Sequence, residues 1–570
     1  MTATAVRPQS RWLLPEAPDS VAVAVLCREL NLPELVCRLL VARGHQEIEG
    51  AKRYLRPRLE HLHDPSTLAD LDRAVDRIVR GIRGGETILI HGDYDVDGIC
   101  STTILTRTLR WLGGSVTPFI PHRRNGYDLT AAGVAAAKTA GAKLVVTCDC
   151  GTSALAPVSE LQRAGIDVIV TDHHLPGGPL PAAYAILNPR KPGCPSPDKD
   201  LCAAGVAFKL AMAVTKAMGA SPNPVFNMLD LVALATVADV APLRGENRVL
   251  SIYGLKLLNE TKNVGLRAMI RAAGLDRKPI TAGRVGFILA PRLNAAGRVG
   301  SAMRGVELLL ATEDAVANPI ARELEELNGH RQQLDREVLE QARDMVRGID
   351  LDQTYGLVLA AEGWHPGVIG IVASRIVEEF GRPTILIALE GDEGKGSGRS
   401  ISPFDLHAGI SRCGELLLRF GGHRSAAGVT VARDRVPDFA RRFNEVARET
   451  LTPADLVPEL RADLEVELQD LTDGLEALLR HVEPCGIGNP SPVLIARGVR
   501  VAAPPKVVGK DGLRVLLHQG ATEITALGWG MASRAVELSV GSTVDVAFRL
   551  ERDEWNGESR LQARLADFRA

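Results

Sequence analysis

The stretch "TILIHGDYDVDG", residues 87–98, sets an apolar run directly before three carboxylates, Asp93, Asp95 and Asp97. The apolar run predicts a buried β-strand, and "STTILTRTLRWLGG" (101–114) has the apolar spacing and glycine stop of a following helix. Ionised carboxylates on alternate residues repel one another unless a positive charge lies among them. We therefore expect a cation at the end of this strand.

Two more apolar runs, "KLVVTCDCG" (143–151) and "DVIVTDHH" (167–174), also end in acid or histidine. Continuous apolar strands separated by helices predict an α/β fold with a parallel sheet covered on both faces. Ligands of such sheets collect beyond the carboxyl ends of the strands, so these polar residues should converge. Asp239 in "ATVADVAPL" (235–243) joins them, because an acid in apolar sequence is rarely buried without a partner.

The converging set combines carboxylates and imidazoles without thiolates, which suits Mn²⁺ or Mg²⁺. Its members are His91, Asp93, Asp95, Asp97, Asp149, Asp172, His173, His174 and Asp239. These are more ligands than one ion needs. We expect two ions per site, roughly 3.5–4 Å apart and bridged by an aspartate, an arrangement that serves in-line displacement at phosphorus. An EF-hand calcium loop fits less well, because Ile104 or Thr106 stands where that loop requires glutamate.

The bulk composition is that of a globular protein, with 45% hydrophobic and 24% charged residues in a chain of 570. The formal net charge of −2 means that any nucleic-acid binding must depend on local basic patches. We expect no membrane span and no signal peptide, because the sequence has no apolar run of suitable length. The nine unpatterned cysteines indicate reduced thiols and a cytoplasmic location.

The chain is too long for one core, and we expect several domains. An apolar stripe predicts a long helix from 315 to about 347, and the last 110 or so residues contain short β-type runs with a "WNGES" hairpin signal. Such a region suits a small barrel of the OB type. The expected divisions are a helical N-terminal extension (1–75), a parallel-sheet domain (76–310), a connecting helix (311–350), a second α/β domain (351–452) and the OB-type barrel (453–570).

Four motifs, "HGDYDVDG", "VTCDCG", "TDHH" and "TVADVAPL", resemble in order those of the DHH phosphoesterase superfamily. The segment "RFGGHRSAAG" (419–428) resembles the signature of the associated DHHA1 domain. Further blocks resemble the bacterial single-stranded-DNA-specific exonucleases of that superfamily: "CAAGVAFKL" (202–210), "PRLNAAGRVGSA" (291–302), "GWHPGVIGIVASR" (363–375) and "EPCGIGNPSP" (483–492). The similarity extends from about residue 40 to the end of the chain.

The resemblance implies a 5′→3′ exonuclease that degrades single-stranded DNA to mononucleotides with Mn²⁺ or Mg²⁺, in recombination and repair. It implies single-strand binding protein and a RecQ-type helicase as partners, and we expect a monomer. It assigns the metal ligands to His91 or Asp93, Asp95, Asp97, Asp149 as the bridge, His173 and Asp239. His174 is expected to face the scissile phosphate and to act in catalysis with Asp149 and Asp97, while Asp172 orients a histidine ring.

Several residues are candidates for binding the DNA strand. Arginine suits phosphate because its planar fork makes paired, charge-assisted contacts. We expect Arg298 to bind the strand, and Ser397 with Arg399 in "GKGSGRSIS" (394–402) to bind the 5′-phosphate together with backbone N–H groups. The further candidates are Arg123, Gly421, Gly422, His423 and, for base stacking, Trp529 and Trp555.

Alternatives remain open for some of these residues. The "GGHRSAAG" segment could be a tight turn that starts a helix, and either tryptophan could belong to a core. Arg123 lies in "PHRRNGYD", where Asp128 replaces the glycine usual in the family and the spacing is one residue shorter, so Arg124 could take the role of Arg123. The whole chain could instead be a DHH phosphodiesterase for short oligoribonucleotides or cyclic dinucleotides, or a non-catalytic DNA-binding scaffold. The extra barrel argues against the first, and the complete set of acids and histidines against the second.

Overall fold

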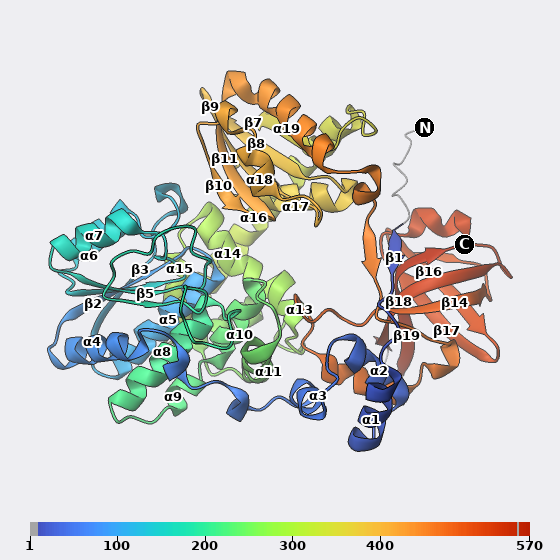
Figure 1. Cartoon of the computed structure of the whole chain (residues 1–570), viewed down its shortest axis with the longest axis horizontal. Coiled ribbons are helices and arrows are strands. Elements are labelled where there is room, and N and C mark those ends of the chain that lie inside the picture. Colours follow the sequence, from blue (N-terminus) through green and yellow to red (C-terminus); the bar gives the residue numbers. More distant parts are fainter. Residues whose placement is uncertain (1–9, 556–557) are drawn as a thin grey trace. The chain divides into compact units, whose positions relative to one another are not determined.

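The computed structural model describes residues 10–555 and 558–570 (Figure 1). The side chain of Trp555 lies outside the described part, so its proposed stacking stays a prediction. The chain forms two compact units. One contains Leu14–Glu325 and Ala462–Ala570, and the other contains Glu326–Arg461 with the N-terminal strand β1 (Arg11–Leu13), which pairs with β12 (Glu459–Arg461).

The first unit is built around a five-stranded parallel sheet in the order β3-β2-β4-β5-β6. Its strands are β2 (Thr87–Gly92), β3 (Ser115–Phe119), β4 (Leu144–Cys148), β5 (Asp167–Thr171) and β6 (Ala185–Leu187). Helices α6 (Ala131–Thr139) and α7 (Leu155–Arg163) pack on one face, and α4 (Leu71–Arg83), α5 (Val96–Trp111) and α8 (Ala203–Ala217) cover the other (Figure 1). The predicted covered parallel sheet is confirmed.

A helical layer follows the sheet in the chain and carries the fourth acidic motif. Its helices are α9 (Asn223–Phe226), α10 (Leu229–Ala238), α11 (Gly245–Asn259), α12 (Val264–Ala272), α13 (Ala282–Arg284), α14 (Ala290–Val299) and α15 (Met303–Leu310). Helix α10 is buried along its length and packs against α5 and α11. The predicted long helix is α16 (Asp314–Arg347). In the described chain, no helix has the length and apolar character needed to cross a membrane.

The second unit contains a mixed five-stranded sheet in the order β10-β11-β9-β8-β7. The strands are β7 (Leu357–Glu362), β8 (Thr384–Glu390), β9 (Glu393–Arg399), β10 (Arg419–His423) and β11 (Ala426–Ala432), of which only β7 and β8 run parallel. The second half of α16 and α17 (Ile369–Phe380) form a core with one face of the sheet, and α18 (Leu406–Ser411) and α19 (Val436–Thr450) form a core with the other.

The C-terminal strands close into a barrel, because β14 pairs with both β18 and β16. The strands are β13 (Leu464–Glu465), β14 (Leu494–Val501), β15 (Lys506–Val508), β16 (Gly512–Gln519), β17 (Thr522–Gly528), β18 (Thr543–Trp555) and β19 (Glu558–Arg569), with α20 (Asp473–Leu479) between β13 and β14. This confirms the predicted OB-type barrel.

The N-terminal helices share one apolar core with the barrel. They are α1 (Ser20–Leu30), α2 (Glu34–Ala42) and α3 (Ile48–Leu55), and Figure 1 draws them beside the barrel strands. Buried Leu26 and Leu40 belong to the same cluster as Leu494 and Phe548. The N-terminal extension therefore completes the barrel's core and does not stand apart from it.

Candidate active site

The turn after β2 brings three aspartates to the edge of the sheet. Asp95 caps helix α5 by accepting hydrogen bonds from the amides of Asp97 at 2.9 Å and Gly98 at 3.1 Å. A side chain at Gly98 would overlap the carbonyl of Asp93, so the turn requires glycine there. Asp97 consequently lies in the first turn of the helix, buried, where its carboxylate accepts the amides of Ala203 and Ala204 at 2.7 Å each.

The second strand delivers Asp149 in a left-handed conformation, with φ 65°. Its amide donates to the carbonyl of Thr171 at 3.0 Å, which continues the ladder between β4 and β5. The side chain is 2% exposed and points into the same edge of the sheet as Asp97. This backbone conformation aims a buried carboxylate at the point where the strands end.

His173 lies at the centre of the site. Its Nε2 is 3.1 Å from Asp149 Oδ1, 3.7 Å from Asp97 Oδ2 and 3.7 Å from Asp239 Oδ2. Asp239 follows α10, so four distant segments of the chain meet here. The structure thus brings together the polar strand ends as the sequence predicted.

Three groups of possible metal ligands overlap within the described residues. They are Asp97–His173–Asp239, Asp93–Asp95–Asp149 and Asp149–His173–His174, with the ligand atoms of each group within 4.8 Å of one another. Asp149 Oδ1 and His173 Nε2 are buried and, although 3.1 Å apart, neither makes a hydrogen bond within the described part of the chain. A cation would satisfy both atoms, so the donor set fits Mn²⁺ or Mg²⁺.

His91 belongs to none of these groups. Its ring is fully buried, with Nδ1 3.6 Å from Cys150 Sγ and Nε2 against Gly133, where a Cβ would come within 2.6 Å. Asp93 does belong to a group. Between the two residues that the sequence left open, the geometry favours Asp93 as the direct ligand.

Burial and mutual repulsion govern the electrostatics of the cluster. Burial, with the charge of neighbouring carboxylates, raises the pKa of Asp93, Asp149 and Asp239 well above the usual range, and that of Asp97 to about 7. Burial also lowers the pKa of His173 to about 3, which leaves its ring neutral and able to donate to a metal. The cluster is poorly suited to ionise without a counter-charge.

His174 forms a separate pair with Asp172. Its Nδ1 is 2.7 Å from Asp172 Oδ1, and the second oxygen of Asp172 accepts the amide of Thr152. Burial alone would lower the pKa of His174, but the hydrogen bond and charge of Asp172 raise it to about 9. Asp172 therefore holds this ring by a hydrogen bond and raises its pKa in the metal-free protein.

Tyr127 and Asp128 were not assigned a role from the sequence. Tyr127 Oη lies 3.1 Å from His174 Nε2. Asp128 has φ 78°, a conformation in which glycine is common, and its carboxylate accepts the amide of Gly151 at 2.6 Å. The departure from the usual glycine at this position thus supports the loop next to Asp149.

Comparison with known proteins identifies the family. Family models match residues 87–236 (DHH family, N-terminal domain), 353–449 (DHHA1 domain) and 462–567 (RecJ OB domain). The single-stranded-DNA-specific exonuclease RecJ of Bacillus subtilis is 36% identical over 561 residues, which cover 98% of this chain and 70% of the relative. The chain belongs to the RecJ family.

Solved RecJ structures agree with this fold and with the predicted metals. RecJ from Thermus thermophilus in complex with Mn²⁺ matches with a TM-score of 0.85 and 33% identity, over 98% of this chain and 79% of that one. The Mg²⁺ complex matches with a TM-score of 0.79 and 31% identity, over 98% and 78%. The predictions of a DHH enzyme, of the DHHA1 and OB domains and of Mn²⁺ or Mg²⁺ as cofactor are confirmed.

Two of the expected strand-binding arginines of this RecJ-family chain lie near the acidic turn. Arg123 stacks over the ring of Tyr94 with its guanidinium 4.7 Å from the ring centre. Arg298 is in α14, whose Gly297 packs so closely on the carbonyl of Tyr94 that a Cβ would overlap it. Asn294 of the same helix accepts the amide of Val96 at 3.2 Å, a contact that the sequence did not indicate.

The expected 5′-phosphate residues lie in the RecJ DHHA1 unit. Ser397 and Arg399 are on the same face of β9, and Arg399 Nη1 donates to Ser397 Oγ at 3.2 Å. They face the start of α17, where a Cβ at Gly370 would lie 2.8 Å from Ser397 Oγ. The backbone N–H groups of β9 cannot form the predicted cradle, because β9 is an inner strand paired with both β8 and β11. Any anion binding at β9 would therefore depend on side chains such as those of Ser397 and Arg399.

The "GGHRSAAG" segment forms a hairpin and not the start of a helix. Gly421, Gly422 and His423 are exposed on β10, the edge strand next to β11. Gly422 has φ 142°, and a Cβ there would overlap the carbonyl of Ala426. An exposed edge strand has one row of backbone groups directed away from its partner strand.

Proposed function

We propose that this chain hydrolyses single-stranded DNA from the 5′ end to mononucleotides with two Mn²⁺ or Mg²⁺ ions, in DNA recombination and repair. The observation that carries the proposal is the overlap of three possible ligand groups, two of which contain Asp149. Asp97, His173 and Asp239 would hold one ion, and Asp93 with Asp95 the other, with Asp149 between them. When bound, such ions stabilise charge on a phosphate and lower the pKa of water.

His174 is the residue we assign to the scissile phosphate. Its Nδ1 proton is held by Asp172 at 2.7 Å, so the proton on Nε2 is the one available to the substrate. A charged imidazole there neutralises phosphate charge and can give its proton to the departing 3′ oxygen. The ring is about half exposed, which leaves it accessible to a DNA strand.

Each unit contains candidate groups for binding the strand. Arg399 with Ser397 would bind the terminal phosphate, and the exposed edge of β10 would run beside the sugar-phosphate backbone. Arg123 and Arg298, which lie near the acidic turn, would contact other phosphates of the strand. Trp529 at the end of β17 is 53% exposed, which favours its role as a stacking platform over a place in the core.

The wider setting follows from the same proposal. We propose single-strand binding protein and a RecQ-type helicase as partners, because both generate or hold the single strands that the enzyme requires. We also propose that the protein acts as a monomer in the cytoplasm, where its nine cysteines would stay reduced thiols. The closed barrel supports long strands as substrates over dinucleotides, and the convergence of all the acids supports an enzyme over a scaffold.

The test uses single-stranded DNA labelled at the 5′ or the 3′ end, with and without Mn²⁺. Release of labelled mononucleotide at once from the 5′-labelled strand, and only late from the 3′-labelled strand, is expected, and only with metal. A dinucleotide substrate serves as the comparison. Immediate release from the 3′ label, or faster cleavage of dinucleotides than of long strands, contradicts the proposal.

A further inference from the structure

Helix α10 ends in an unusual way immediately after Asp239. The amide of Ala241 donates to the carbonyl of Thr236 at 3.1 Å and that of Val240 to Val237 at 3.3 Å. In this Schellman pattern the residue after the cap is left-handed and is usually glycine. Here it is Val240, with φ 59°. Because β-branched residues rarely adopt this conformation, the surroundings must hold it in place.

The loop at 483–490, within the "EPCGIGNPSP" block that has no role so far, supports the residues that follow Val240. The amide of Leu243 donates to the carbonyl of Ile487 at 2.7 Å. Gly488, with φ 73°, lies so close to Pro242 that a Cβ would come within 2.9 Å of the proline Cβ. A Cβ at Gly486 would come within 2.8 Å of Leu243 Cδ1. The loop therefore lies directly against this segment.

Hydrogen bonds to other segments of the same unit hold this loop in place. Asn489 is buried and donates to the carbonyls of Val482 at 2.7 Å and Pro484 at 2.8 Å, while its Oδ1 accepts the hydroxyl of Tyr54 at 2.7 Å. Arg248 of α11 donates to three carbonyls, each at 2.9 Å, those of Tyr54, His481 and Val482.

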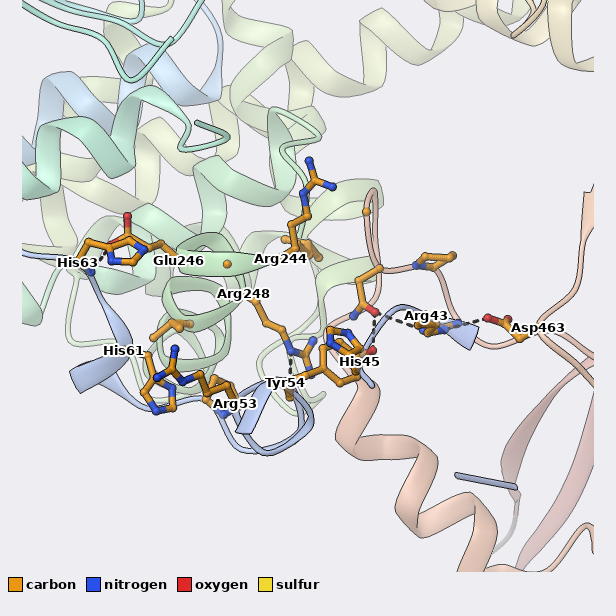
Figure 2. Close-up of a pocket in the computed structure, with 18 residues that line it drawn as sticks. Arg43, His45, Arg53, Tyr54, His61, His63, Arg244, Glu246, Arg248 and Asp463 are labelled. Atoms are coloured by element: carbon orange, nitrogen blue, oxygen red, sulfur yellow. Dashed lines mark hydrogen bonds and ion pairs between the residues drawn. The ribbon is translucent and has the colours of Figure 1, made fainter. Parts of the chain in front are cut away.

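Figure 2 shows Arg248 reaching Tyr54, and Arg43 directed towards Asp463, at the edge of a pocket of about 550 Å³. Arg43 and Tyr54 come from the N-terminal helical region, Arg248 from α11, and Asp463 from the segment leading into the barrel. The support behind Pro242 and Leu243 is thus anchored by three parts of the chain.

We propose that the 483–490 loop is a positioning element for the metal centre. By fixing Pro242 and Leu243 it holds Val240 in its left-handed conformation, and that conformation sets the direction of the Asp239 carboxylate. The inference rests on the proposed role of Asp239 as a metal ligand. We class Val240 and Gly488 as positioning residues, because neither side chain offers an atom that can bind a metal ion.

The test measures the Mn²⁺ dissociation constant of the metal-free full-length protein by calorimetry. Gly488→Ala should weaken Mn²⁺ binding about tenfold, the size of effect typical for groups that support a ligand. Gly520→Ala is the matched control, because Gly520 has φ 60° and nothing within 4 Å of its added Cβ. Gly520→Ala places alanine at a similar positive φ but creates no contact like that with Pro242. It should therefore bind Mn²⁺ as the parent does.

A rescue experiment separates positioning from general damage. Val240→Gly should leave Mn²⁺ affinity unchanged by itself, and should restore most of the affinity when combined with Gly488→Ala, because glycine no longer resists φ near 60°. If Gly488→Ala fails to fold, Gly486→Ala replaces it, since its new methyl meets only the flexible end of Leu243.

Parent-like affinity in a folded Gly488→Ala protein, or no rescue by Val240→Gly, overturns the inference. The variant Asp239→Asn separates the assignment of Asp239 as a metal ligand from the positioning role of the loop. If Asp239→Asn retains Mn²⁺ affinity, the ligand assignment itself has failed. If it loses affinity while the glycine variants do not, only the positioning role has failed.

Discussion

Asp149 illustrates how single residues make this site. It combines burial, a left-handed backbone and an oxygen without a hydrogen-bond partner among the described residues. The sequence pattern of an apolar strand ending in acid was enough to find Asp149, because strand ends of a parallel sheet converge. It was not enough to find Tyr127, which comes from a loop, or to separate Asp93 from His91, since both flank the same strand end.

Asp149→Asn should remove metal binding and catalysis while leaving the fold intact. Asparagine has the same shape and tolerates a positive φ, so the backbone at 65° is kept. We expect kcat to fall by about 10³-fold or more, as for loss of a group that stabilises transition-state charge. Mn²⁺ should raise the melting temperature of the parent but not of the variant, because only the parent binds it.

This variant also tests whether the acidic cluster strains the metal-free protein. Without a cation, Asp149 is buried among like charges, and replacing it by a neutral isostere should raise the metal-free melting temperature by a few degrees. A lower melting temperature for metal-free Asp149→Asn, or an undiminished Mn²⁺ shift, would reject its place between the two ions.

Arg399→Ala should reduce the preference for 5′-phosphorylated DNA. The Arg399 fork and the Ser397 hydroxyl share one face of β9 with Lys395, and a charge-assisted hydrogen bond from Arg399 contributes about 1.5–3 kcal/mol. We expect the ratio of kcat/KM for phosphorylated and unphosphorylated strands to fall about tenfold or more. An unchanged ratio in a variant with reduced activity would assign Arg399 to general strand binding instead.

At the scale of elements, apolar patterns located β2, β4, β5 and α16, but not the strands β3 and β6 or the helices between β6 and α16. Helix α10 is the clearest case, because it is buried on all sides and has no polar face to reveal its period. The glycine-rich 394–402 segment was misinterpreted for a different reason. Its glycines suggested a phosphate-binding loop, whereas Gly394 and Gly396 lie in a strand where Ile387 and Val429 occupy the space of a side chain.

Gly297→Ala tests the packing of α14 on the acidic turn. Its methyl would overlap the carbonyl of Tyr94, so either the helix or the turn must move. We expect a loss of about 1–3 kcal/mol in the free energy of unfolding, measured in urea, with weaker Mn²⁺ binding. Gly329→Ala in α16 is the matched control, because it has nothing within 4 Å and should stabilise by about 0.5–1 kcal/mol.

At the scale of the whole molecule, the shared core of the N-terminal helices and the barrel was not predictable. The sequence indicated a helical N-terminal extension, but nothing in one sequence says which surface covers its helices. Tyr54 and Asn489, which join the two regions, are 435 residues apart. Contacts between residues so far apart form only when the whole chain folds, and no local sequence pattern reveals them.

Leu40→Ala should therefore destabilise the barrel. Leu40 is 1% exposed in the common core, and its truncation should cost about 2–5 kcal/mol. Hydrogen exchange should accelerate in β14 to β19 as well as in α1 to α3, while β7 to β9 of the other unit keep their protection. Faster exchange confined to α1 to α3 would show that the barrel has a sufficient core of its own.

The joining of the first helices to the last strands also matters during synthesis. At about 5–20 residues per second, a ribosome needs between about 20 and 90 s to pass from Tyr54 to Asn489. Throughout that interval the newly made helices have no partner for their apolar faces. Nascent chains of this protein should accordingly depend on chaperones that shield an exposed amino-terminal segment until the end of the message has been translated.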